Sequence, residues 1–385
     1  MSHPKMNWNP RYEDALNLLL QRVQHTEIEV ANHWPYHADP ATGQWAVTED
    51  GDWCGGHWVE CLRIAAELTG NPQLQASAVL RTERLRPYLE RDDQFRGHRF
   101  YYSAARQFDA TGNESFRTLG LAAAYAMRSM AMAVNGAMPI GTQVQVKSTN
   151  LASRSIVAVD NVHPNIQLDW WARRLTGDTT FEMGARKHLD TTIRDFIRHD
   201  GSTVEFIEYN PETGQPLKEF TLLGAHDHSC WSRGQAWAIA GYLRAWEELG
   251  DEQYLAIARK LLAYWLGHSD SSTVPPWDFM DPLLKTNPKA VPLDTSASAI
   301  VVEQLARIAA RSDLSALAPD MVEALHTMME GLLAHLTPKE DAKPGRLLNG
   351  CFNQPREFAN HSELIWGTAY LLFALYYLKT GKVPA

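Results

Sequence analysis

Apolar residues recur along most of this 385-residue chain at the three- and four-residue spacing of helices that bury one face. Alternation of apolar and polar positions, the pattern of a half-buried strand, is confined to short segments. The spacing predicts about twelve helices. They span residues 16–30, 58–68, 76–89, 101–110, 116–134, 166–175, 181–198, 235–249, 254–266, 297–310, 319–336 and 363–378.

A glycine recurs at the ends of these helices, at Gly70, Gly112, Gly177, Gly250 and Gly381. Glycine readily takes the left-handed conformation that ends a helix, and the Asn or Asp after four of the five can cap the next helix. The chain is therefore predicted to form six helical hairpins. They favour an all-α fold, an (α/α)6 toroid in which an outer ring of helices surrounds an inner ring, in one domain over residues 1–385. An open helical solenoid is the alternative, although its repeats would be more regular.

Two segments depart from the helical pattern. Residues 202–216 show rough alternation and an Asn-Pro-x-x-Gly turn, which predicts a small β-hairpin. Residues 273–282 contain too many prolines for a helix or a strand. We expect both segments to lie over the mouth of the toroid, where its loops would form a site.

Composition narrows the classes of partner. Hydrophobic residues make up 45% and charged residues 21%, as in an ordinary globular protein. The net charge of −9 and the absence of Lys/Arg clusters argue against binding to nucleic acid. We find no apolar run typical of a signal peptide or a membrane span, which predicts a cytoplasmic protein, or a periplasmic one if a leader has been removed. The oligomeric state is not predicted.

The cysteine content also fits a cytoplasmic protein. Cys54, Cys61, Cys230 and Cys351 are too sparse for a disulfide framework and lack the spacing of a metal site. We expect them to be reduced and buried.

Residues 225–242 are the most distinctive stretch, because a polar segment rich in Trp and His leads there into an apolar helix. Arg233 and Trp237 lie four residues apart and share a helix face, with Trp231 at its start. A guanidinium matches the geometry of a carboxylate, and an indole offers a flat apolar surface, so the face suits a uronic acid sugar. An equally weighted alternative is a Trp-rich core in which Arg233 pairs with an internal Asp or Glu.

Other polar clusters are weaker candidates. His226 and His228 could converge on a metal ion, but no third ligand is evident, and we expect neither a metal nor a cofactor. Asp278 and Asp281 could form a paired-carboxylate site or cap turns in the proline-rich segment. Asp294 is predicted to cap the helix that follows it.

Asp160 lies in an otherwise apolar segment, residues 156–162. Burial there would raise the pKa of its carboxyl group and let it hold a proton. The alternative is that Asp160 caps a helix beginning near Val162, and the residues alone favour this slightly.

Several motifs, in order along the chain, resemble those of unsaturated glucuronyl hydrolases and the related unsaturated rhamnogalacturonyl hydrolases. The most specific is Ser-Cys-Trp-Ser-Arg-Gly-Gln-Ala-Trp at residues 229–237. Others lie at residues 52–58, 159–165, 200–203, 210–214, 276–279, 294–299 and 364–367. The resemblance covers the chain from about residue 50 to its C-terminus.

The resemblance implies an (α/α)6 barrel that acts on oligosaccharides left by polysaccharide lyases, which carry a 4,5-unsaturated uronic acid at the non-reducing end. Such enzymes hydrate the C4=C5 enol ether, and the hemiketal formed collapses to release the sugar. Asp160 matches the aspartate that protonates C4 and then activates water for C5. Trp53, Trp231, Arg233 and Trp237 match positions that contact the uronate.

The chain also departs from the pattern. The family's His-Asp-x-Gly-Phe stretch aligns with residues 94–98, where its aspartate is missing unless Asp92 or Asp93 replaces it. The family's hairpin histidine corresponds to Glu205, and a glutamine corresponds to about Leu223. His226 and His228 are further polar groups that the family's pattern lacks. We therefore expect a substrate pocket that differs from the family's and includes Glu205 and both histidines.

Two other functions remain open. One is an inverting glycosidase that uses Asp160 and Glu205 on a saturated uronide, which would need the carboxyl groups roughly 6.5–9.5 Å apart. The other is a sugar-binding toroid without catalysis. Because Asp160 is retained within its motif, the hydrolase is favoured.

Overall fold

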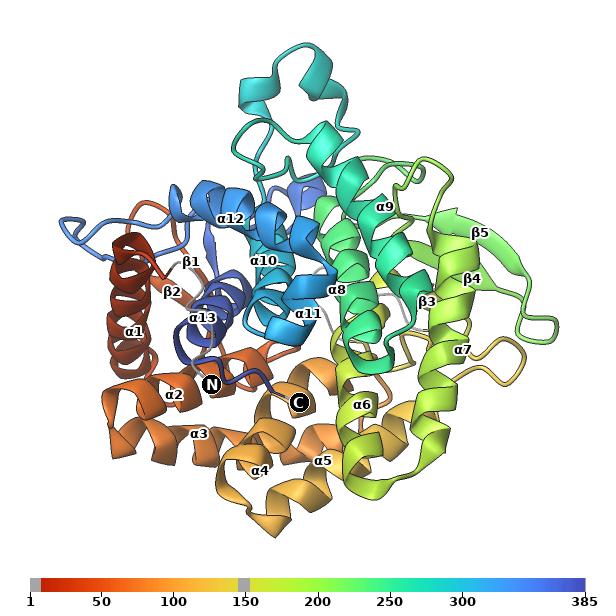
Figure 1. Cartoon of the computed structure of the whole chain (residues 1–385), viewed down its shortest axis with the longest axis horizontal. Coiled ribbons are helices and arrows are strands. Elements are labelled where there is room, and N and C mark those ends of the chain that lie inside the picture. The colour runs from red at the N-terminus through yellow and green to blue at the C-terminus, as the bar shows by residue number, and fades with distance from the viewer. Residues whose placement is uncertain (1–7, 145–152, 385) are drawn as a thin grey trace.

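In the computed structural model, which describes residues 8–144 and 153–384, helices form two concentric rings (Figure 1). The inner ring consists of α2 (Gly55–Thr69), the π-helix η2 (Gly97–Ala105), α6 (Pro164–Thr176), α8 (Ser232–Leu249), α10 (Thr295–Ala309) and α13 (Ile365–Thr380). The outer ring consists of α1 (Pro10–Val30), α3 (Pro72–Leu85), α5 (Glu114–Arg128), α7 (Thr179–Phe196), α9 (Glu252–His268) and α12 (Pro319–Leu333).

The inner ring is closed. Each inner helix contacts the next one along the chain, and α13 contacts α2, so the last inner helix meets the first. Each outer helix packs against the inner helix that follows or precedes it. The predicted (α/α)6 toroid is therefore confirmed, and the open solenoid is excluded because its ends would not meet.

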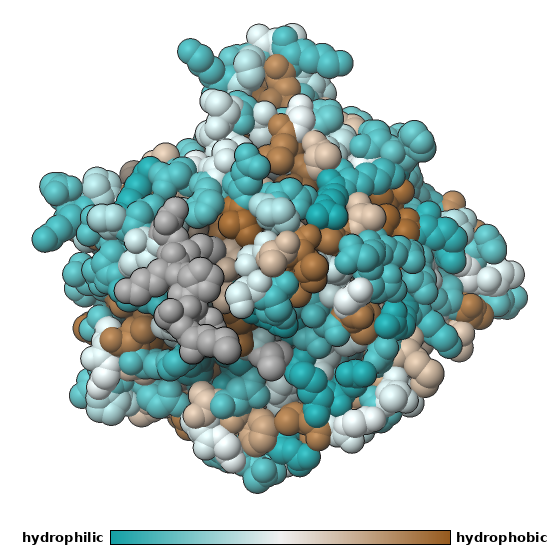
Figure 2. Space-filling model, viewed as in Figure 1, coloured by the Kyte–Doolittle hydropathy of each residue, from teal (hydrophilic) through white to brown (hydrophobic). Residues whose placement is uncertain are grey.

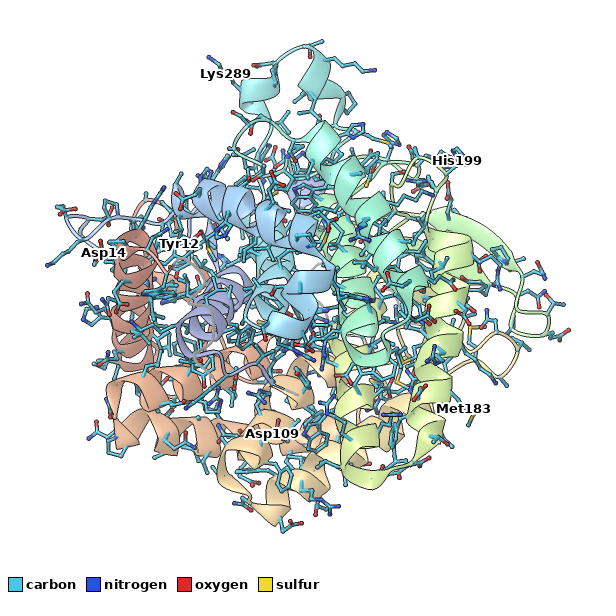
Figure 3. All side chains as sticks on the ribbon, viewed as in Figure 1. Tyr12, Asp14, Asp109, Met183, His199 and Lys289 are labelled. Carbon is cyan, nitrogen blue, oxygen red and sulfur yellow. The ribbon has the colours of Figure 1, made fainter. Side chains whose placement is uncertain are left out.

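Burial differs between the two rings. Every residue of α10 is buried, whereas α7 buries one face and exposes Met183 on the other (Figure 3). The face of the molecule in Figure 2 is mostly hydrophilic, with apolar side chains in small separate groups. The apolar stripes of the outer helices are thus directed against the inner ring, as their spacing predicts.

Two small sheets lie among the loops. In the first, β3 (Ile156–Ala158), β4 (Phe206–Tyr209) and β5 (Pro216–Phe220) pair in that order and antiparallel. This confirms the predicted hairpin and adds a strand from the segment before Asp160. The second sheet, of β2 (Trp45–Thr48), β1 (Trp34–Ala38) and β6 (Glu363–Leu364), was not predicted. Its strands come from both ends of the described chain, a pairing that local spacing does not encode.

Shorter elements complete the chain. They are α4 (Arg106–Thr111), α11 (Ser312–Leu317), η1 (Arg86–Glu90), η3 (Val159–Val162), η4 (Pro282–Lys285), η5 (Pro288–Ala290) and η6 (Gln354–Arg356). The proline-rich segment is irregular, as predicted, and the following η4 and η5 project from the body of the molecule, where Lys289 marks the tip (Figures 1 and 3).

Some predicted helix ends were wrong. The helix predicted over residues 116–134 ends at Arg128 and gives way to turns. The one predicted over 363–378 begins at Ile365, because the two residues before it pair as β6. That predicted over 76–89 changes to the 3-10 helix η1 before Pro87, where a regular α-helix is disfavoured.

No helix in the described ranges combines the length and apolar content needed to cross a membrane.

Candidate active site

A cavity of about 590 Å³, measured with its mouth, opens where the start of α8 meets the β3–β4–β5 sheet. Its aromatic lining comes from five segments distant in sequence. These side chains are Trp53, Phe95, Phe206, Trp231, Trp237 and Phe352. Four polar side chains face the same space: Gln94, Asp160, Glu205 and Arg233.

The start of α8 places three of these side chains. The helix begins at Ser232, whose Oγ donates to the Trp277 carbonyl at 3.0 Å. Arg233 and Trp237 then project from one face into the cavity, as their four-residue spacing predicts. Trp231 lies just before the helix, with the Arg233 guanidinium 4.6 Å from its ring centroid.

Arg233 is held by the protein as well as facing the cavity. Its Nη1 donates to Asp294 Oδ2 at 2.6 Å and to the Cys351 carbonyl at 2.7 Å, and its Nη2 donates to the Phe352 carbonyl at 2.8 Å. The internal ion pair considered from sequence is therefore present. A guanidinium has five N–H groups, so these bonds leave two for a ligand. Fixed in this way, Arg233 is pre-oriented toward the cavity.

Asp160 follows β3 and lies in the 3-10 helix η3. It caps no helix, because α6 begins at Pro164 and its N-cap residue is His163. The capping alternative was therefore wrong. Asp160 Oδ1 is buried without a hydrogen-bond partner in the described residues. Burial, followed by the nearby Glu205 carboxylate, raises the pKa of Asp160 to about 7, so its carboxyl group can carry a proton near neutral pH.

Glu205 precedes β4 and lies beside Asp160 because their strands pair. Ala158 is opposite Phe206, and the Val159 amide donates to the Glu205 carbonyl at 2.9 Å. Glu205 Oε2 accepts hydrogen bonds from the Thr221 hydroxyl and from the Leu222 and Leu223 amides, the latter two at 2.9 and 3.0 Å.

The two oxygens of Glu205 are in different surroundings. Oε1 is buried without a partner in the described residues, and so is Gln94 Oε1 nearby in the lining. An unsatisfied buried polar group costs about 1–3 kcal/mol, so the cavity is built to receive hydrogen-bond donors from a ligand or water. Burial raises the pKa of Glu205 to about 6, while the three hydrogen bonds to Oε2 act in the opposite direction.

Asp92 and Asp93 do not supply a second carboxylate to the cavity. Asp93 is fully buried and accepts two hydrogen bonds from Arg99 at 2.8 and 2.9 Å. Asp92 accepts from the Thr142 hydroxyl and from Arg154. Glu205 is instead the second carboxyl group that lines the cavity with Asp160.

His226 and His228 do not line this cavity. Both side chains are exposed, and His228 contacts Glu219 on β5. Their predicted role in substrate binding stays a prediction, and it would require a ligand that extends beyond the cavity.

Two other sequence candidates have structural roles. Asp278 accepts from the Ala225 amide, the Ser229 hydroxyl and the Met280 amide, and Asp281 accepts from the Leu283 amide and the Trp277 indole. They cap turns and do not form a carboxylate pair. Asp294 accepts from the Ser296 amide at 3.1 Å, which confirms the predicted cap of α10.

The indoles of the site are fixed by aromatic neighbours. The centroid of Trp53 lies 4.7 Å from that of Trp366, and Trp237 is stacked with His163 at 5.7 Å. Such packing keeps flat apolar surfaces in place for a sugar ring.

Sequence reasoning missed part of the lining. Gln94 and Phe95 were considered only as a departure from the family's motif, and Phe352 was not considered. The first two could have been found from that motif. No local signal identifies Phe352, which reaches the cavity from a loop more than 100 residues after Arg233.

Comparisons with known proteins agree with this geometry. An unsaturated glucuronyl hydrolase from Bacillus sp. (strain GL1) is 27% identical over 382 residues, which cover 97% of both chains. A crystal structure of the unsaturated glucuronyl hydrolase from Bacillus sp. GL1 matches with a TM-score of 0.85 and 26% identity, covering 96% of this chain and 97% of that one. The chain is therefore similar to unsaturated glucuronyl hydrolases in both sequence and fold over nearly its whole length.

Among the curated relatives of this hydrolase family, an unsaturated chondroitin disaccharide hydrolase from Streptococcus pyogenes serotype M1 is 27% identical over 375 residues, covering 94% of this chain and 89% of that protein. No model of a protein family matches the chain. The likeness to the hydrolases extends over nearly the whole chain, so it includes both rings and every segment that lines the cavity.

Proposed function

We propose that this protein is a glycoside hydrolase that removes a 4,5-unsaturated uronic acid from the non-reducing end of oligosaccharides produced by polysaccharide lyases. The names of its relatives support the reaction class, because they are hydrolases of unsaturated glucuronyl and chondroitin substrates. The observation that carries the proposal is Asp160, whose Oδ1 is buried and unpartnered in the described residues and whose pKa is raised to about 7 within a cavity that also contains Arg233 and three indoles.

Asp160 is proposed as the general acid. Its proton would be added to C4 of the enol ether, and the positive charge that develops at C5 would be relieved by attack of water. The resulting hemiketal opens and releases the rest of the oligosaccharide. Trp53, Trp231 and Trp237 would pack against the sugar ring, and the two free N–H groups of Arg233 would bind its carboxylate.

The proposed partner is an oligosaccharide with a terminal unsaturated uronic acid, taken by one catalytic domain without a metal or cofactor. The proposed compartment is the cytoplasm. Its support is that the four cysteines are buried free thiols, as is usual in reducing compartments.

The first prediction concerns Asp160. The wild-type protein should consume the enol-ether absorbance of some members of a panel of lyase-generated disaccharides. Asp160→Asn should lower kcat by about 100-fold or more while leaving the affinity for the disaccharide unchanged, because the amide keeps the shape but has no acidic proton. Absorbance assays of turnover measure kcat, and calorimetric titration measures the affinity for the disaccharide.

Asp190→Asn is the matched control, because Asp190 is exposed on α7 and away from the cavity lining. It should leave both quantities unchanged. Wild-type protein that leaves the absorbance of every disaccharide unchanged would contradict the proposed reaction.

A second candidate function is inverting hydrolysis of a saturated uronide, and the presence of Asp160 and Glu205 in one cavity favours it. Release of the aglycone from a saturated uronide, with inversion at the anomeric carbon, would identify this reaction.

A further inference from the structure

The two carboxyl groups of the cavity have unequal surroundings. Glu205 Oε2 accepts three hydrogen bonds, from Thr221, Leu222 and Leu223, whereas Asp160 Oδ1 has no partner in the described residues. Two of the three donors are backbone amides of one turn, which cannot reorient with pH. Donors aimed at a carboxyl oxygen favour its charged form, so this arrangement selects Glu205 as the anion of the pair.

Charged groups near Asp160 and Glu205 also favour a charged Glu205 and a protonated Asp160. Arg233 favours ionisation of both carboxyl groups, and its own charge is balanced by Asp294. The Glu205 carboxylate in turn disfavours ionisation of Asp160. One proton is therefore kept in the pair and it resides on Asp160.

The free oxygen of Glu205 is placed where it can bind a reacting water. Oε1 is buried and unpartnered, and Glu205 lines the cavity with Asp160. A water that donates one hydrogen bond to Oε1 would satisfy this oxygen and be held beside the acid.

We infer that Glu205 is the general base of the reaction and that Asp160 acts as the general acid alone. This inference rests on the hydration reaction proposed above. In one step, the O–H bond of Asp160 breaks and its proton forms a C–H bond at C4 with the electron pair of the C4=C5 bond. The water oxygen forms a bond to C5, and the proton lost by the water passes to Glu205 Oε1. Exchange with solvent protons then restores the anionic Glu205 and the protonated Asp160.

The second prediction tests this division of labour with Glu205→Gln, which keeps the size of the side chain and an oxygen to accept the Leu222 and Leu223 amides. We expect kcat to fall by about 100-fold or more with little change in KM, because a neutral amide cannot accept the proton. The decline of kcat at acid pH, which reports protonation of Glu205, should disappear from the residual activity. Glu208→Gln, the same change on strand β4 outside the cavity lining, should match the wild type.

Chemical rescue provides an independent readout. Glu205→Ala removes the carboxyl group and leaves space for a small carboxylate. Added formate should raise the kcat of Glu205→Ala in a concentration-dependent way, and it should have no effect on Glu205→Gln, whose amide still fills that space.

The outcomes separate this inference from the proposed reaction. A raised KM with unchanged kcat in Glu205→Gln would make Glu205 a binding residue and overturn the inference. A lowered kcat that keeps its acid decline and gains nothing from formate in Glu205→Ala would also overturn it. Inactivity of the wild type on every unsaturated disaccharide would instead reject the proposed function.

Discussion

At the scale of single residues, the site is defined by which polar atoms lack partners. Arg233 and Asp294 satisfy each other, whereas one oxygen each of Asp160, Glu205 and Gln94 is left without a partner in the described residues. Groups left unpaired in the resting protein cost stability, and this cost is characteristic of sites that bind polar ligands.

The third prediction follows from the raised pKa of Asp160. A carboxyl group with a higher pKa in the folded state than in the unfolded state binds protons more tightly when folded. Its contribution to stability is therefore lost as pH rises from about 4 to about 7, the pKa of Asp160. Asp160→Asn, which cannot ionise, should be more stable than the wild type at pH 8 by a few kcal/mol.

Urea unfolding at pH 5 and pH 8 measures this effect. The advantage of Asp160→Asn should shrink toward acid pH, and the exposed Asp190→Asn should show no such dependence. An Asp160→Asn variant that is less stable than the wild type at pH 8 would show that the carboxylate is not destabilised by its surroundings.

At the scale of elements, the position of Asp160 depends on the packing of η3 against α8. Gly241 of α8 lies so close to η3 that an added Cβ would meet the Val162 carbonyl oxygen at 2.2 Å. Only a glycine allows this approach, because the neighbouring atoms belong to the backbone. The helix that carries Arg233 and Trp237 is thereby held against the turn that carries Asp160.

The fourth prediction concerns this contact. Gly241→Ala should destabilise the protein by about 1–3 kcal/mol and lower kcat, because α8 and η3 must move apart. Gly267→Ala is the matched control, since Gly267 also lies in a helix and an added Cβ there meets nothing within 4 Å. It should be neutral or slightly stabilising. Thermal unfolding and kcat measured on both variants test this, and equal effects would contradict it.

At the scale of the whole molecule, the ring is closed by contacts between the two ends of the chain. Arg22 on α1 donates to Glu363 on β6, with 2.6 Å between Nη2 and Oε2, and both side chains are buried. The same glutamate accepts from Thr368 on α13 at 3.1 Å. A buried ion pair therefore joins the first helix to β6, the strand that leads directly into the last helix.

The fifth prediction concerns this closure. Arg22→Met leaves Glu363 buried without its charged partner, which should cost about 3–5 kcal/mol. Arg11→Met breaks an ion pair with Glu330 that is about half exposed, and it should cost less than about 1 kcal/mol. Urea unfolding compares the two variants. A similar small loss in both would mean that Glu363 finds other partners or water.

The sequence by itself determined the helices, the fold class and the best catalytic candidate. Helical spacing and glycine caps depend on neighbours within a few residues, so the local sequence is enough to predict them. The shared face of Arg233 and Trp237 on α8 is an example. Only the tertiary structure decided the partners of the charges. The pairing of β3 with β4 brought Glu205 to Asp160, and Phe352 and Asp294 reached Arg233 from distant loops. Such contacts join residues far apart in the chain. They form only when the closed ring of helices brings its loops together at one end.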